Sequence, residues 1–203
     1  MAVRRSRSVR ESAFVVRRAA RSEKPVIRRL LELYQYDLSR IDGRELDHRA
    51  RYGYHYLEHY WRERGRFPYL IQVDGHWAGM ALVNKHSPIG GADWSMAEFF
   101  VLPPYRRRRI GERVARWLFD QHPGKWHVAH DAENREAQRF WRAVLTRYTA
   151  GRLKEVSVRD QRWTGHVQIF TSPPRGKLDH RSPRPRPTTL VPRERGPNSR
   201  DGQ

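Results

Sequence analysis

Glu98-Phe-Phe-Val-Leu-Pro-Pro-Tyr-Arg-Arg-Arg-Arg-Ile-Gly-Glu-Arg-Val-Ala115 is the most informative stretch of this 203-residue sequence. An apolar run ends at Pro103-Pro104, four arginines follow, and a helical pattern begins near Ile110. The first N–H groups of an α-helix have no partner inside the helix, and the helix dipole adds positive charge there. The stretch therefore predicts an anion-binding turn between a strand and a helix, with Gly111 allowing close backbone approach.

The spacing of this turn excludes two common phosphate-binding motifs. A kinase-type P-loop needs Gly-Lys-Ser/Thr, and the dinucleotide fingerprint needs three spaced glycines; neither is present. Taken alone, the turn fits a solvated basic loop or a nucleic-acid patch as well as a ligand site.

The hydrophobic pattern around this stretch alternates between strand and helix periods. It predicts seven strands, two of which form a hairpin whose tight turn is Asp74-Gly75. They lie at 14–19, 68–73, 77–83, 94–102, 126–130, 153–158 and 166–170. It predicts helices at 23–38, 45–62, 110–119 and 134–145. We therefore expect a mixed α/β (α+β) domain with a central sheet of about six to seven strands and about four helices on its faces.

The formal charge of +19 is divided between this domain and its flanks. Residues 1–10 contain four Arg and no acid, and residues 172–203 contain eight Lys or Arg against three acids. We expect a basic flexible N-terminus over 1–12, a domain over 13–171 and a disordered Arg/Pro-rich tail over 172–203. Such a charge attracts nucleic acid, anionic lipid or a polyphosphate cofactor without distinguishing among them.

The composition also limits the cellular compartment in which this protein is expected and the metal sites that it can form. There is no cysteine, so disulfides and thiolate metal sites are excluded. The longest apolar runs are about four residues, such as 13–16, whereas a membrane span needs about twenty. No apolar stretch of signal-peptide length, about seven residues or more, follows the basic N-terminus. We therefore expect a cytoplasmic protein without a membrane partner.

Two segments resemble the GNAT superfamily of N-acetyltransferases. The family's acyl-CoA-binding motif reads Arg/Gln-x-x-Gly-x-Gly/Ala after a strand that often ends Val-x-Pro-x-Tyr, and the matching residues here are Val101, Pro103, Tyr105, Arg106 and Gly111. Arg109 departs from the motif, because it stands at the first glycine. The segment beginning Asn134-Arg-Glu-Ala-Gln-Arg-Phe-Trp resembles the second motif, Asn-x-x-Ala-x-x-Phe-Tyr.

The resemblance covers residues 13–171, and the segments at 33–39, 70–75 and 98–102 are similar to a bacterial branch of uncharacterised predicted acetyltransferases. It implies a GNAT-like fold with acetyl-CoA in a cleft between splayed fourth and fifth strands. It implies a cofactor site formed by Phe100, Val101, Arg106, Arg107, Arg108, Arg109, Ile110, Gly111, Glu112, Asn134, Ala137 and Trp141.

The resemblance further implies direct transfer of acetyl to a primary amine. A backbone N–H of Phe100 or Val101 polarises the thioester carbonyl. The general base is Glu98 or His130, which we leave open. The usual tyrosine acid is replaced by Trp141, whose indole is too weak an acid. Tyr148 is the candidate acid, with Tyr34, Tyr36, Tyr105 or water as alternatives.

The acceptor side is predicted on the two early helices and the last hairpin, with Tyr34, Tyr36 and Asp37 as candidate substrate-binding residues. No acidic cluster typical of a polyamine or aminoglycoside site is evident, so the acceptor class stays open. His55 and His59 are four residues apart, but Tyr56 stands where the zincin pattern needs Glu, so we expect no metal.

A second function belongs to a different class. The charge, Arg109 and Trp141 also fit a catalytically weakened GNAT-fold binding module whose basic surface binds nucleic acid non-specifically or a protein partner. The predicted tail has no aromatic residue on which bases could stack, which disfavours this alternative. Oligomeric state, monomer or homodimer, has no specific signal in the sequence.

Overall fold

The computed structural model describes residues 13–159 and 163–174. These residues form seven strands: β1 (Phe14–Arg18), β2 (Phe67–Val73), β3 (His76–Asn84), β4 (Trp94–Val101), β5 (Gly124–Asp131), β6 (Lys154–Arg159) and β7 (Thr164–Ser172). They form three α-helices: α1 (Lys24–Asp42), α2 (Ile110–Gln121) and α3 (Arg135–Thr149). The expected flexible N-terminus and most of the expected tail lie outside the described residues.

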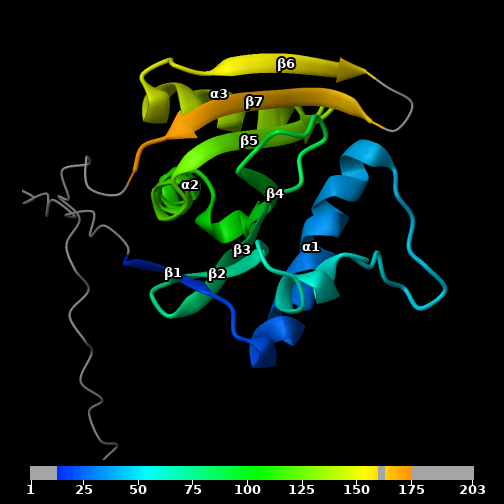
Figure 1. Ribbon diagram of the computed structural model, residues 1–203. Helices are drawn as coiled ribbons and strands as arrows, with labels where there is room; N and C mark the ends of the chain where they lie inside the picture. The colour runs from blue at the N-terminus through cyan, green and yellow to red at the C-terminus, as the bar shows by residue number, and fades with distance from the viewer. Residues whose placement is uncertain (1–12, 160–162, 175–203) are drawn as a thin grey trace, which may run out of the picture.

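All seven strands belong to one sheet in the order β1-β2-β3-β4-β5-β7-β6. The β4–β5 pair is parallel, and the other neighbours are antiparallel. Figure 1 shows β6 and β7 at one end of the sheet and β1 and β2 at the other, with β4 between them. The predicted mixed α/β fold class is therefore confirmed.

The helices cover opposite faces of the sheet, and alternate strand residues show which helix each face meets. Val114, Leu118 and Trp141 of α2 and α3 share a buried cluster with Ile71 and Val83. A second buried cluster joins α1 to the other face, through Ile27, Leu30, Leu31, Leu70, Met80, Leu82 and Phe100. In Figure 1, α2 and α1 accordingly lie on different sides of the central strands. The sheet thus separates an α1 face from an α2/α3 face.

The predicted helix over 45–62 is wrong. The segment is mostly irregular and ends in a 3-10 helix at Leu57–Trp61. The Asp47 carboxylate accepts hydrogen bonds from the N–H groups of Arg49 and Arg51, at 2.8 and 2.9 Å. Such local bonds offer the backbone an alternative to helix. Among the described residues there are therefore three α-helices rather than the expected four.

Glu32 on α1 holds the same segment from outside. Its carboxylate oxygens accept the N–H groups of Tyr52 and Gly53, at 2.9 and 3.0 Å. The Tyr52 hydroxyl lies 3.2 Å from the Ser39 hydroxyl on the same helix. The segment is thereby held across α1, so Tyr54 reaches the middle of the sheet.

The other boundaries lie close to those predicted. The Asp74-Gly75 turn joins β2 to β3, with positive φ angles of 49° and 80°. β7 extends one residue past the predicted domain boundary, to Ser172, whose hydroxyl donates to the Phe119 carbonyl at 2.6 Å. Helix α1 begins at Lys24, one residue after the predicted start, and follows a short 3-10 turn at Arg21–Glu23.

Gly79 in β3 is required by its close approach to β4. A Cβ atom at this position would lie 2.0 Å from the Phe100 carbonyl oxygen. We expect Gly79→Ala to lower the free energy of unfolding by about 3 kcal/mol, because backbone atoms of β4 must move. Urea denaturation measures this loss. Gly43→Ala is the control: it meets nothing within 4 Å at a φ of +66° and should cost about 1 kcal/mol. Equal losses in the two variants would contradict the close approach.

Candidate functional site

A cavity of about 1020 Å³ opens where β4 and β5 part. The two strands pair from Trp94 to Met96 on β4 and from Trp126 to Val128 on β5. Beyond these pairs, both β4 and β5 contribute to the lining of the cavity, together with α1, the loop before α2, and α3. The site is therefore a gap between parallel strands that is reached from both faces of the sheet.

A β-bulge determines which side chains of β4 face α1. Leu82 pairs with Glu98 and Val83 pairs with Met96, so Ala97 is an extra residue on β4. Because of this extra residue, Met96 and Phe99 both pack on the α2/α3 face although they are three residues apart. Phe100 packs on the α1 face, and by alternation Glu98 shares that face.

The backbone of β4 presents polar groups to the gap. The Leu102 N–H donates to the Ala78 carbonyl at 2.8 Å, which directs Leu102 and, by alternation, Phe100 toward β3. Val101 and Phe99 then point their N–H and C=O groups toward β5. Arg106 uses this arrangement, since its Nε donates to the Val101 carbonyl at 2.8 Å. Of the two predicted backbone donors, the geometry favours Val101, because the Phe100 N–H faces β3.

Glu98 lines the cavity, and its surroundings shift the pKa of its carboxyl. Burial raises the pKa of its carboxyl to about 7, although hydrogen bonds donated by the hydroxyls of Tyr54 and Tyr34 and the charge of Arg44 act in the opposite direction. The nearby Asp131 carboxylate raises the pKa further. A carboxyl with a pKa near neutrality can accept and release a proton at physiological pH.

His130 lies on the other face of the sheet. It alternates with Trp126 and Val128, which belong to the α2/α3 core, and it is 7% exposed. Its Nδ1 lies 3.4 Å from the Asp131 carbonyl oxygen, and its buried Nε2 has no partner among the described residues. Burial lowers the pKa of the imidazole. Glu98 and His130, the two candidate bases, therefore line the same cavity from opposite faces.

The loop before α2 combines two unusual backbone conformations with a helix start. Arg107 and Arg109 both have a φ of 58°, in the left-handed region. The Arg113 N–H donates to the Arg109 carbonyl at 3.1 Å, so the N–H groups of Ile110, Gly111 and Glu112 precede the first bond of α2. Side chains of Arg107 and Arg109 line the cavity beside them. This end of the cavity is suited to a phosphate group.

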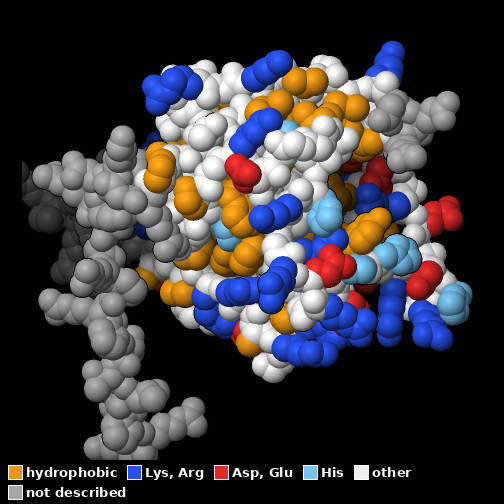
Figure 2. Space-filling model, in the orientation of Figure 1, with side chains coloured by type: hydrophobic (Ala, Val, Ile, Leu, Met, Phe, Trp, Pro, Cys, Tyr) orange, Lys and Arg blue, Asp and Glu red, His pale blue; other side chains and the backbone are white. Residues whose placement is uncertain are grey.

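The wider surface is basic as well. Figure 2 shows Lys and Arg side chains spread over the visible face and gathered along its lower edge, with few Asp or Glu side chains among them. A surface of this sign attracts anions over long range.

A protein-family comparison agrees with this geometry. Residues 28–145, more than half of the chain, match the model of the acetyltransferase (GNAT) family. This chain belongs to the GNAT acetyltransferase family. A search of curated proteins found no match.

Solved GNAT structures have the same fold. An acetyltransferase from Thermus thermophilus is 14% identical, with a TM-score of 0.55 over 78% of this chain and 96% of that one. Spermidine N-acetyltransferase from Vibrio cholerae, solved with CoA and spermine, is 10% identical, with a TM-score of 0.53 over 78% and 95%. The aminoglycoside acetyltransferase AAC(6')-Ib, solved with coenzyme A, is 12% identical, with a TM-score of 0.54 over 78% and 95%. At these identities the likeness concerns the fold.

The predicted cofactor residues of this GNAT chain are mostly brought together. Of the twelve, ten line the cavity: Phe100, Val101, Arg106, Arg107, Arg109, Gly111, Glu112, Asn134, Ala137 and Trp141. The guanidinium of Arg108 stacks over the Tyr105 ring at 5.7 Å, and Ile110 is buried in the α2/α3 core, so neither lines it. Their predicted part in cofactor binding stays a prediction.

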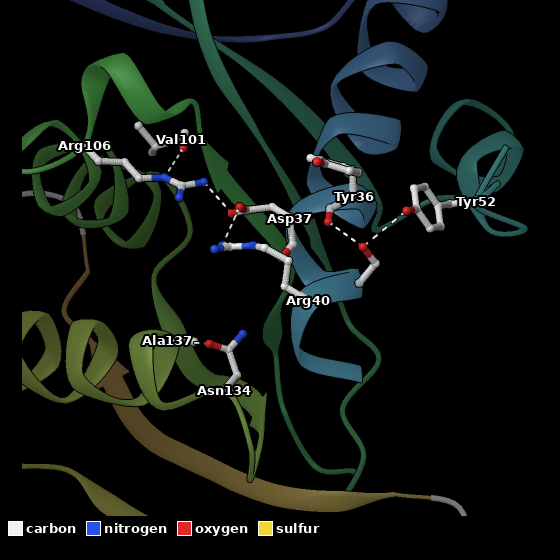
Figure 3. A network of polar contacts seen from close by, with 9 residues as sticks. Tyr36, Asp37, Arg40, Tyr52, Val101, Arg106, Asn134 and Ala137 are labelled. Carbon is white, nitrogen blue, oxygen red and sulfur yellow. Dashed lines mark hydrogen bonds and ion pairs between the residues drawn. The ribbon is translucent and has the colours of Figure 1, made fainter. Parts of the chain in front are cut away.

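Several of these side chains hold the cavity walls. Arg106 donates to Asp37 on α1 at 2.6 Å as well as to Val101, and Figure 3 shows it reaching from the loop toward α1. Glu112 accepts two hydrogen bonds from Arg147 on α3, at 2.8 and 2.9 Å, which lower the pKa of its carboxyl. These two ion pairs fix α1 and α3 relative to the phosphate-binding turn.

The second motif forms the start of α3. The Asn134 side-chain oxygen accepts the Ala137 N–H at 2.9 Å and caps the helix. Trp141 is 5% exposed and packs against the Phe99 ring at 5.0 Å between centroids. Trp141 therefore forms apolar wall at the position where most GNAT members have tyrosine.

The predicted acid and substrate residues divide into two groups. Tyr34 and Asp37 line the cavity. Tyr36 is 64% exposed and outside the lining, and Tyr148 donates its hydroxyl to Asp120 at 2.7 Å near Ser172. Neither location supports the role predicted for Tyr36 or Tyr148. Tyr105 also lies outside the lining, so Tyr34 is the one of the four candidate tyrosines that the cavity contains.

Sequence reasoning did not single out four residues at the α1 end of the cavity. Tyr54 and Arg44 come from the irregular segment after α1, and Asp131 and Trp163 come from the end of β5 and the start of β7. The sequence signals were weak, since Tyr54 was one of several tyrosines in an expected helix. The adjacency of these residues arises from strand pairing.

No metal site or membrane span is found in the described parts of the chain. Within 13–159 and 163–174, no group of three or more metal-ligating side chains is placed to hold an ion. His55 lies in a turn, and His59 pairs with Glu63, so the helical pair considered from the sequence does not form. No helix in these ranges has the length and apolar character needed to cross a membrane.

Arg109 provides a test of the turn. A non-glycine residue in the left-handed region is strained by about 1 kcal/mol, so Arg109→Gly should raise the free energy of unfolding by about that amount. Thermal denaturation measures the change. Arg108→Gly is the matched control, because Arg108 has no positive φ, and it should be destabilising. If both glycines change stability alike, the left-handed turn is contradicted.

Proposed function

We propose that this chain transfers the acetyl group of acetyl-CoA to a primary amine. The observation that supports this most directly is Glu98, a carboxyl with a pKa of about 7 that lines the gap between β4 and β5, the same gap that Val101 lines. The gap, the phosphate-binding turn and the apolar wall at Trp141 fit the three parts of such a cofactor: thioester, pyrophosphate and pantetheine arm. Acetyl-CoA, when bound, supplies the acetyl group as an activated thioester.

The cofactor side of the proposal uses the backbone more than side chains. The N–H groups of Ile110, Gly111 and Glu112 bind the pyrophosphate, and Arg107 and Arg109 add charge. Gly111 lets the start of α2 pack closely against Phe140 of α3, since a Cβ atom at this position would lie 3.2 Å from the Phe140 ring. The Val101 N–H donates to the carbonyl oxygen on which negative charge develops.

The acceptor side uses the α1 face. Glu98 accepts a proton from the ammonium group of the acceptor and so produces the nucleophilic amine. Tyr34 and Tyr54 orient the Glu98 carboxylate by their hydroxyl groups. Tyr34 is the proposed proton donor to the leaving thiolate, because it lines the cavity and is hydrogen-bonded to the group that has just gained a proton. His130 lies on the other face and is proposed to form the cavity wall.

Cofactor binding is tested by calorimetry with acetyl-CoA on the full chain. We expect binding in the micromolar range and a loss of about tenfold or more in the double variant Arg107→Glu/Arg109→Glu, because two charges at the phosphate are reversed. Arg139→Glu is the control, an exposed α3 residue outside the cavity. A folded wild-type chain that does not bind acetyl-CoA would contradict the enzyme and favour the basic binding module.

The base is tested by the pH dependence of CoA release with an accepted amine. Glu98 acts in its ionised form, so kcat/KM should fall as the pH drops below about 7, and Glu98→Gln should lower kcat about 100-fold or more. Glu133→Gln, an exposed substitution outside the cavity, is the control and should match the wild type. The assignment of Glu98 fails if its variant keeps both the wild-type rate and the wild-type pH profile.

A further inference from the structure

The cavity has an acceptor end whose charges and walls can be described residue by residue. Tyr34, Glu98 and Asp131 influence one another electrostatically, so they lie close together on the α1 face. The Trp163 indole N–H donates to Asp131 at 2.5 Å, which places the start of β7 beside them. This set is separate from the phosphate-binding turn, which opens on the α2/α3 side.

The carboxylates around this end are already held by this chain's own donors. Asp37 accepts from Arg40 at 2.8 Å and from Arg106 at 2.6 Å. Asp42, just behind the rim, pairs with Arg44. Because the Trp163 indole N–H occupies Asp131, Glu98 is the carboxyl at this end whose hydrogen-bond partners are hydroxyl groups, those of Tyr34 and Tyr54, while the charge of Arg44 acts on it from nearby.

The other two carboxylates that line the cavity are on the cofactor side. Glu112 forms the two-point ion pair with Arg147, and Glu136 is an exposed residue in the first turn of α3. A second or third ammonium group on an acceptor, if placed at the acceptor end, would therefore compete with Arg40 and Arg106 for Asp37 and with Arg44 for Asp42. Asp131 has a neutral donor, the Trp163 indole N–H, instead of an arginine. Burying a cation without a counter-ion is costly.

One wall of the acceptor end is apolar, although Gln35, Arg40 and Arg44 also line the cavity. Tyr34, Leu38 and Ile41 follow one another at intervals of four and three residues, so they form one stripe along α1. Pro88 from the β3–β4 loop and Trp163 from the β6–β7 hairpin add apolar surface to the lining. Such a surface gains free energy by covering hydrocarbon or an aromatic ring.

We propose that the acceptor is a monoamine with an apolar or aromatic body, whose single ammonium group meets Glu98 while its body lies on the Tyr34–Leu38–Ile41 stripe and Trp163. This inference rests on the proposed amine acetylation and specifies its substrate class. It excludes polyamines and aminoglycosides as preferred acceptors, although two proteins with the same fold carry those names. In the reaction the amine nitrogen forms a bond to the acetyl carbon, the carbon–sulfur bond breaks, and the thiolate takes a proton to leave as CoA.

A matched pair of amines tests the class. Hexylamine and 1,6-diaminohexane have the same chain and differ in one ammonium group. We expect kcat/KM for hexylamine, measured as CoA thiol release by the full chain, to exceed that for the diamine about tenfold or more, with spermidine lower still and 2-phenylethylamine accepted. A preference for the diamine or spermidine would overturn the inference and leave amine acetylation intact. Acetyl-CoA binding without turnover of any amine would overturn both.

A variant tests the apolar wall. Leu38→Asp places an unpaired carboxylate on the stripe, so the ratio of hexylamine to diamine kcat/KM should fall about tenfold while acetyl-CoA affinity, measured by calorimetry, stays within twofold. Leu33→Asp is the control on the exposed side of α1, where Leu33 is 49% exposed, and should keep the wild-type ratio. If Leu38→Asp binds acetyl-CoA normally and keeps the ratio, or if it no longer binds, the wall assignment is withdrawn.

Discussion

The parting of β4 from β5 is the constraint on which the site depends. Parallel pairing covers Trp94–Met96, and the bulge at Ala97 follows directly, so the hydrogen-bonding edge of β4 turns toward open space. Open backbone donors in a protein interior are costly unless a ligand or water meets them. Arg106 satisfies one group, the Val101 carbonyl, and at the same time ties the loop to α1. The gap is thus stabilised by the protein's own contacts, and its remaining N–H groups can donate hydrogen bonds to a ligand.

The bulge also explains the division of chemical roles between the faces of the sheet. With one extra residue on β4, Glu98 joins the α1 face while Phe99 stays with α2 and α3. The carboxyl therefore meets Tyr34 and Tyr54, and the apolar rings of Phe99 and Trp141 form the wall on the opposite side. In the proposed reaction, a cofactor in the gap and an acceptor from the α1 side would approach each other from opposite directions, so an amine and a thioester would meet without sharing one entrance.

Local sequence signals predicted the local structure. The strand, prolines and arginines before Ile110 predicted a turn at a helix start, and Asn134 predicted a cap, because these effects act between residues a few positions apart. The same reasoning failed over 45–62, where the apolar spacing favoured a helix. Hydrogen bonds that its backbone N–H groups donate to Asp47 within the segment and to Glu32 on α1 determine its path instead. The second of these lies outside the segment, so periodicity could not reveal it.

By itself, the sequence determined the mixed fold, the turn at the start of α2 and the acetyltransferase family, since motif residues and strand and helix periods are properties of short stretches. The tertiary structure decided which of Glu98 and His130 faces α1, which tyrosine lies in the cavity, and that Asp37, Asp42 and Asp131 are held by neighbouring donors. These outcomes depend on a one-residue bulge and on contacts between segments far apart in the chain. A shift of one residue in strand register moves each side chain of the strand to the opposite face of the sheet. Composition and residue spacing do not indicate whether such a shift occurs.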